Sequence, residues 1–167
     1  MARQMLIRGA LQADLPILAE YWYDRMVMVQ QYNPQVRLLP QAQQRWQAAA
    51  EGWLNDPNTI FQVAETPGQD LLGGVAGQIV DNDAGLAPAK IGQVVAFVID
   101  LHTPRLQAGV GRILIDTLRQ QLAQRHIQRI MITVFPALSV EAAFWQAIGA
   151  RQYSGNYWLR SDTEHTK

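Results

Sequence analysis

The stretch of sequence that decides the fold is LHTPRLQAGVGR, residues 101–112. It follows the apolar run 91–101, whose near-continuous hydrophobicity predicts a strand buried on both faces. It leads into residues 109–125, where apolar side chains recur at helical spacing, so an amphipathic helix is predicted there. Gly109 and Gly111 allow the backbone to approach a ligand closely, because glycine has no Cβ. The pattern is therefore a buried strand, a glycine-bearing turn and a helix.

The turn in front of this helix has the chemistry of an anion site. The first amides of a helix have no intrahelical acceptor, and the helix dipole places partial positive charge there. A phosphate or pyrophosphate suits such a position. A plain β–α turn, with glycines for tight packing, accounts at least as well for the Gly-x-Gly pair alone. A dinucleotide fingerprint is disfavoured because Leu114 stands where a third Gly or Ala is needed, and no Gly-Lys-Ser/Thr triplet of a P-loop occurs.

Working outward from this stretch, periodicity and turn residues predict the element order β-α-α-β-β-β-α-β-α-β-β. The predicted strands are 5–8, 60–65, 71–80, 91–101, 129–135, 152–153 and 157–160, and the predicted helices are 14–31, 41–54, 109–125 and 139–148. No repeat or linker interrupts this order. We therefore expect one α/β domain over residues 1–160, followed by a polar tail, 161–167.

Composition removes several classes of function. The 167 residues include no cysteine, which excludes disulfides, thiol nucleophiles and thiolate metal sites. Fourteen Lys plus Arg balance fourteen Asp plus Glu, so charge does not point to nucleic acid. The three histidines lack ligand spacing, so we expect no metal site. No apolar run is long enough to cross a bilayer, and residues 1–8 lack the apolar core of a signal peptide, so we expect a cytoplasmic protein with no membrane partner.

Two motifs resemble those of the GNAT superfamily of acetyl-CoA-dependent N-acetyltransferases. Residues 106–111, LQAGVG, match the family's Arg/Gln-x-x-Gly-x-Gly/Ala at both glycines, with Leu106 in place of the leading Arg or Gln. Residues 139–150, SVEAAFWQAIGA, resemble Asn-x-x-Ala-x-x-Phe-Tyr-x-x-x-Gly-Phe, with Phe144 and Gly149 fitting. Trp145 stands in place of the tyrosine that often acts as general acid. The element order over the whole chain also resembles that of the family.

The resemblance implies a single-domain GNAT-like fold, with a central mixed and largely antiparallel sheet of about 6–7 strands flanked by about 4 helices. It also implies acetyl-CoA as co-substrate and no metal. The pyrophosphate would lie on the amides of residues 107–112, the pantetheine arm along the fourth strand, and Ser139 within reach of the arm. Phe144 and Trp145 would wall the thioester end, although ordinary core packing accounts equally well for Phe144. The implied cofactor-binding residues are Ile99, Leu101, Leu106, Gln107, Ala108, Gly109, Val110, Gly111, Arg112, Ser139 and Phe144.

The implied reaction is attack of a neutral amine on the thioester carbonyl, which needs a base or a water relay. In a regular strand, residues 93, 95, 97, 99 and 101 share one face, and none is acidic. The catalytic residues are therefore unassigned, with Glu65, Asp100 and Trp145 as candidates; each also has a structural interpretation. The acceptor is a small-molecule amine or a peptide N-terminus, and a homodimer stays open. A non-catalytic acyl-CoA-binding module is the alternative function.

Overall fold

A five-stranded sheet forms the centre of the protein in the computed structural model, which describes residues 5–102, 109–135 and 139–158. Its strands are β1 (Leu6–Gly9), β2 (Thr59–Glu65), β3 (Leu71–Asp81), β4 (Lys90–Ile99) and β5 (Ile130–Met131). They lie in the order β1-β2-β3-β4-β5. The first three pairings are antiparallel and the pairing of β4 with β5 is parallel, so the sheet is mixed and largely antiparallel.

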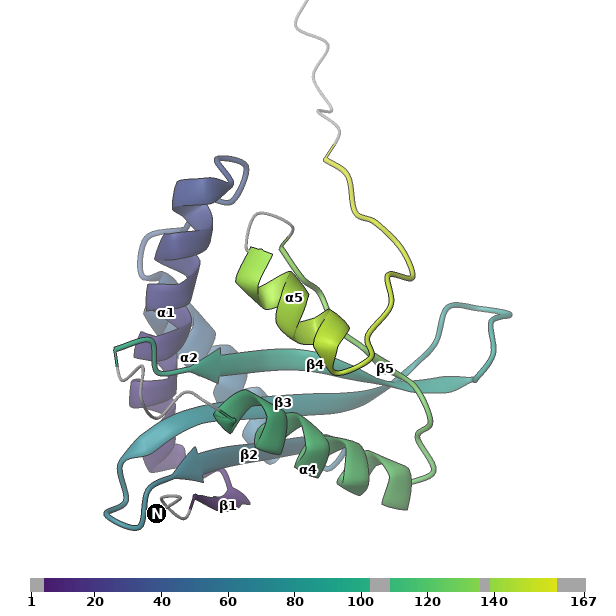
Figure 1. Ribbon diagram of the computed structural model, residues 1–167, viewed down its shortest axis with the longest axis horizontal. Coiled ribbons are helices and arrows are strands. Elements are labelled where there is room, and N and C mark those ends of the chain that lie inside the picture. The colour runs from purple at the N-terminus through teal and green to yellow at the C-terminus, as the bar shows by residue number, and fades with distance from the viewer. Residues whose placement is uncertain (1–4, 103–108, 136–138, 159–167) are drawn as a thin grey trace, which may run out of the picture.

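Four α-helices cover the two faces of the sheet in the described part of the chain. Helices α1 (Leu15–Tyr32) and α2 (Ala42–Asn55) lie on one face, and α4 (Val110–Gln124) and α5 (Ser139–Ala147) lie on the other (Figure 1). A short 3-10 helix, η1 (Gln12–Asp14), leads into α1. Two apolar clusters fill the space between the sheet and these helices, and Leu18 and Leu118 are fully buried representatives of each.

A β-bulge in β4 reverses the facing of part of this strand. Ala96 pairs with Ala76 while Val94 pairs with Gly77, so Val95 is the extra residue. Val95 consequently packs with Ala96 beneath α1 and α2, whereas Val94 and Phe97 pack on the α4 side. The expectation that residues 93, 95, 97, 99 and 101 share one face is therefore wrong. It assumed an unbroken period of two, which a bulge interrupts.

The strands β4 and β5 share only a short contact. β5 pairs with Gly92 and Gln93, and the Gly92 amide also donates to the Arg129 carbonyl at 2.9 Å. Residues 132–135 continue without regular structure, so the predicted strand 129–135 is much shorter than expected. Beyond Gln93, the edge of β4 has no neighbouring strand among the described residues. Because this edge has no neighbouring strand, Phe97 and Ile99 of β4 are only half-buried, whereas the sequence predicted a strand buried on both faces.

The C-terminal segment corrects the predicted strand number. Residues 151–158 have no regular secondary structure, and the sheet has five strands rather than the expected 6–7. Tyr157 and Trp158 are 95% and 85% exposed, and the chain runs away from the domain after α5 (Figure 1). Aromatic residues favour strands, but a strand forms only beside a partner, and none is present in the described residues. The predicted residues 159–160 and the tail 161–167 lie outside the described ranges, and the domain boundaries stay a prediction.

None of the helices within the described ranges combines the length and apolarity that crossing a bilayer requires.

Candidate functional site

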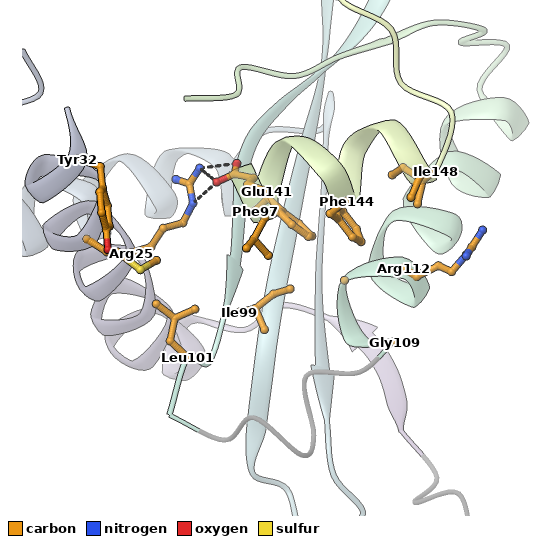
Figure 2. Close-up of a pocket in the computed structure, with 14 residues that line it drawn as sticks. Arg25, Tyr32, Phe97, Ile99, Leu101, Gly109, Arg112, Glu141, Phe144 and Ile148 are labelled. Atoms are coloured by element: carbon orange, nitrogen blue, oxygen red, sulfur yellow. Dashed lines mark hydrogen bonds and ion pairs between the residues drawn. The ribbon is translucent and has the colours of Figure 1, made fainter. Parts of the chain in front are cut away.

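A cavity of about 790 Å³ lies where four elements meet on the α4–α5 side of the sheet. Its walls come from the C-terminal half of α1, the end of β4, the first turn of α4 and one side of α5 (Figure 2). Most of its lining is apolar. The lining residues are Arg25, Met28, Tyr32, Phe97, Ile99, Leu101, Gly109, Gly111, Arg112, Val140, Glu141, Phe144, Ala147 and Ile148.

The first turn of α4 presents backbone amides at one end of this cavity. Gly109, the N-cap, has φ +97°, a conformation that favours glycine, and no described side chain caps the helix. The first intrahelical bond is donated by Ile113 to the Gly109 carbonyl, at 3.0 Å. The amides of Gly111 and Arg112, which line the cavity, precede this bond and have no intrahelical acceptor. Because the helix dipole adds partial positive charge, this end of the cavity suits an anion.

Gly111 also allows α4 and β4 to pack closely. A Cβ at this position would lie 3.0 Å from Ile99 Cδ1 and from Phe97 Cζ, and 3.2 Å from Phe144 Cζ. The missing side chain therefore makes room for three residues that line the cavity. Glycine at 111 lets α4 begin close to β4, which brings the helix N-terminus to the strand's open edge.

The end of β4 forms the floor of the cavity. Phe97, Ile99 and Leu101 line it at every second position, as a regular strand beyond the bulge requires. Since no described strand pairs with this edge of β4 beyond Gln93, its backbone groups there face the cavity side rather than a sheet neighbour. An extended ligand can hydrogen-bond to such an edge as an added strand does.

Helix α5 forms the wall opposite β4. The Phe144 ring stacks on Phe97, with ring centroids 5.7 Å apart and planes at 15°. Trp145 packs edge-on against Phe97 at 5.0 Å, is only 5% exposed and belongs to the core between the sheet and α4. Its indole nitrogen has no hydrogen-bond partner among the described residues. Phe144 thus borders the cavity, whereas Trp145 lies behind that wall.

The candidate carboxylates Glu65 and Asp100 do not line the cavity. Glu65, at the end of β2, accepts a hydrogen bond from Arg8 Nε at 2.9 Å and is 9% exposed. Asp100 follows β4, where its amide donates to the Leu72 carbonyl at 3.0 Å. Its Oδ1 accepts a hydrogen bond from the His102 amide at 2.8 Å. Both side chains therefore take part in local structure, and a catalytic role for either stays a prediction.

The structure gathers about half of the expected cofactor-binding residues around the cavity: Ile99, Leu101, Gly109, Gly111, Arg112 and Phe144 line it. Val110 is fully buried beneath them. Leu106, Gln107 and Ala108 lie outside the described residues, and of Ser139 the structure describes only the backbone, which begins α5. The expected assignment to the cofactor stays a prediction for all of them.

Sequence reasoning missed two charged residues that meet in the cavity. Arg25 on α1 donates to both carboxylate oxygens of Glu141 on α5, through Nη2 at 2.6 and 2.8 Å and through Nε at 3.2 Å (Figure 2). Arg25, Met28 and Tyr32 are spaced for one face of α1. This face of α1, which carries polar as well as apolar side chains, was the sequence feature that could have indicated a site. The sequence near Glu141 does not indicate that this residue lies opposite α1.

A second, exposed pair joins α1 to the residues that follow β4. His102 Nε2 lies 2.8 Å from Asp24 Oδ2. The hydrogen bond with Asp24 raises the pKa of His102 above its ordinary value. Nearby, the Tyr21 hydroxyl donates to the Leu71 carbonyl at 2.9 Å, and burial raises its pKa to about 12. Tyr21 therefore has a structural hydrogen bond, while Tyr32 is the tyrosine that lines the cavity.

Comparison with known proteins places this geometry among solved acetyltransferases. No protein-family model and no curated protein sequence matches the chain. A predicted acetyltransferase from Clostridium acetobutylicum, with acetyl-CoA, is similar at TM-score 0.72 and 12% identity, over 94% of this chain and 96% of that one. An aminoglycoside antibiotic 6'-N-acetyltransferase from Acinetobacter baumannii gives 0.70 and 13%, over 95% and 99%. A GCN5-related N-acetyltransferase from Ralstonia eutropha gives 0.71 and 15%, over 95% and 100%. At these identities the likeness concerns the fold.

Proposed function

We propose that this chain, which has the fold of the GNAT-type acetyltransferases, moves an acetyl or other short acyl group from acyl-CoA to a primary amine. The observation that carries the proposal is the cavity itself. It begins at the first turn of α4, passes Phe97 and Phe144 beside the open edge of β4, and ends at Met28 and Tyr32 on α1. We call the end at α4 the phosphate end and the end at α1 the acyl end.

The residues of the cavity fit the parts of acyl-CoA one by one. The amides of Gly111 and Arg112 suit a pyrophosphate, and hydrogen bonds to a charged group contribute about 1.5–3 kcal/mol each. The backbone of β4 near Ile99 and Leu101 suits the amide groups of the pantetheine arm, as in strand addition. The apolar lining of the cavity, which includes Phe97 and Phe144, excludes water from the bound arm. Acyl-CoA supplies the activated thioester.

The reaction needs little acid–base help from this site. The amine nitrogen attacks the thioester carbonyl, the new C–N bond forms, the C–S bond breaks and the thiolate departs. A thiol has a pKa near 8.5, so the thiolate can leave near neutral pH without a general acid. This fits the position of Trp145, whose N–H is buried behind Phe144. In our proposal the ammonium proton passes to water, because the cavity's described carboxylate, Glu141, is already held by Arg25.

We propose a small-molecule amine as the acceptor. The structurally similar proteins include aminoglycoside acetyltransferases, among them one from Acinetobacter baumannii and one from a soil metagenomic sample. In our proposal the acceptor enters at the acyl end, beside Met28 and Tyr32 of α1. A peptide N-terminus is the other acceptor class that the same chemistry accommodates.

Two measurements test the proposal. Acetyl-CoA should raise the unfolding temperature, because a ligand at 100 times its Kd stabilises the folded state by about 2.7 kcal/mol. Release of free CoA should then increase when amines are added from a panel of aminoglycosides, polyamines, amino acids and short peptides. Absence of any stabilisation by acetyl-CoA contradicts the proposed cofactor site.

Binding without CoA release across the panel would instead support a non-catalytic acyl-CoA-binding module. This second function is favoured by one observation. Within the described ranges, each charged residue that lines the cavity has a charged partner, which leaves Tyr32 as the lining acid–base candidate without one.

A further inference from the structure

Arg25 and Glu141 form the tightest polar contact in the cavity. They lie 116 positions apart in the sequence and come from helices on opposite faces of the sheet. Their side chains are only 17% and 14% exposed, so water competes weakly for the pair. Arg25 also stacks over the Phe135 ring, with its guanidinium carbon 5.7 Å from the ring centroid. The guanidinium is thus oriented from two sides.

Helix α5 depends on side-chain contacts for its position. Residues 132–135, which come before it, have no regular structure, and residues 151–158, which follow it, have none either. Its middle is held by the aromatic contacts of Phe144 and Trp145 with Phe97. Its C-terminal end is held by a hydrogen bond from Arg119 Nη2 to the Ile148 carbonyl at 3.2 Å. The Arg25–Glu141 pair holds its first turn.

The first turn of α5 contributes to the cavity wall between α1 and the start of α4. Glu141 and Phe144 are three residues apart, so they lie on the same side of the helix. Both line the cavity, and Phe144 is the ring that stacks on the cavity floor at Phe97. A shift of this turn away from α1 therefore moves Phe144 away from β4.

We propose that Arg25 and Glu141 form a clasp that holds the first turn of α5 against α1 and thereby positions Phe144 against Phe97, between the two ends of the cavity. The clasp is a positioning device rather than a catalytic group, because both charges are neutralised by each other. Its effect on acyl-CoA rests on the proposed function. Its effect on α5 does not.

Three variants test the clasp. Arg25→Met removes the charge but keeps much of the length, Glu141→Gln keeps the size, and the double variant R25E/E141R restores a pair with reversed charges. Asp81→Asn is the matched control, because it breaks an equally short but exposed pair between Asp81 and Lys90, 2.8 Å apart at the far end of β4.

Hydrogen exchange of the unliganded protein gives the first readout. Amides of residues 139–147 should exchange at least about fivefold faster in each single variant, whereas amides of α2 should keep their rates. The double variant should return α5 toward the wild-type rate, and Asp81→Asn should leave it unchanged. Equal exchange of α5 in wild type and both single variants overturns the clasp. So does a double variant that exchanges as fast as the single ones.

Binding and kinetics give the second readout. Each single variant should bind acetyl-CoA about tenfold more weakly and show a matching rise in KM, with kcat within about twofold of wild type. If the pair only stabilised the fold, breaking it would lower the unfolding temperature but would not raise KM at nearly constant kcat. Wild-type affinity in both single variants overturns the clasp. If wild type itself binds no acetyl-CoA, the proposed function fails, while the exchange experiment still decides the clasp.

Discussion

Two arginine–carboxylate clusters of the same chemistry occupy different places in this molecule. Arg8 joins Asp14 and Glu65 between β1, β2 and η1, with distances of 2.7 Å and 2.9 Å. Arg25 joins Glu141 across the cavity at 2.6 Å. The carboxylate side chains are similarly buried: those of Asp14 and Glu65 are 8% and 12% exposed, and that of Glu141 is 14% exposed. The carboxylates are therefore alike in burial and pairing, but Arg25 and Glu141 line the described cavity, and Arg8, Asp14 and Glu65 do not.

The difference shows what decides whether a paired carboxylate can affect a ligand. Glu65 was a catalytic candidate in the sequence because it ends a strand, but in the structure it contacts Arg8, which also binds Asp14. Glu141 was not a candidate, but it lines the cavity. We infer that the first cluster holds β1 and η1 to the sheet, and that the second acts on the site. The predictions below test this division.

The largest expected effect is on the first cluster. Arg8→Met leaves two largely buried carboxylates without their shared partner, which should lower the free energy of unfolding by about 2–3 kcal/mol. Urea unfolding measures this loss. Below the unfolding transition, acetyl-CoA affinity should stay within about twofold of wild type. If Arg8→Met bound acetyl-CoA more weakly while still fully folded, the first cluster would also affect the site, and the two clusters would not differ in this respect.

Gly111→Val should produce the next largest effect, at the cavity side of the comparison. Its side chain meets Ile99, Phe97 and Phe144, so overpacking should cost about 1–3 kcal/mol of stability. Because these residues line the cavity, acetyl-CoA affinity should fall as well, as isothermal titration calorimetry would show. Gly52→Ala in α2 is the control, since a Cβ there meets nothing within 4 Å and should stabilise the helix by up to about 1 kcal/mol. Unchanged acetyl-CoA affinity in Gly111→Val would contradict the assigned cavity.

Acid should weaken the first cluster through Asp14. Burial works to raise the pKa of Asp14, but hydrogen bonds from Arg8 and the Leu11 amide outweigh it and hold the pKa below the ordinary value of 3.8. A lowered folded-state pKa stabilises the protein fully above pH 3.8 and loses this contribution as pH falls through the folded-state value. The stability difference between wild type and Asp14→Asn should therefore shrink below pH 3.8. A pH-independent difference in urea unfolding would show that charge is not the cause.

The smallest expected effect concerns the exposed pair of His102 and Asp24. The hydrogen bond with Asp24 should keep the pKa of His102 above 6.5, and Asp24→Asn should lower it toward that value in an NMR titration. The raised pKa means that the pair adds stability below pH 6.5 and loses it as pH rises through the folded-state value. At 76% exposure of the His102 side chain, solvent should keep the change in unfolding temperature small. Identical His102 titrations in the two proteins would contradict the contact.

Local patterns predicted most of the regular structure. The predicted hairpin strands 60–65 and 71–80 are observed as Thr59–Glu65 and Leu71–Asp81, and the four predicted helices end within about two residues of their observed bounds. The predicted GNAT-type fold is also confirmed by the solved structures. The strands predicted at 152–153 and 157–160 have the right residue types, but residues 151–158 pair with no described strand. Strand formation depends on a neighbour, which composition alone does not place.

By itself, the sequence determined the helices, the antiparallel core strands and the glycine-marked helix start after β4, because each follows from periodicity and turn chemistry within a few residues. Only the tertiary structure decided the bulge at Val95, the short pairing of β5 and the meeting of Arg25 with Glu141. These features arise from contacts between residues far apart in the chain. Such contacts depend on how whole elements pack, and packing is a property of the folded chain rather than of any local stretch.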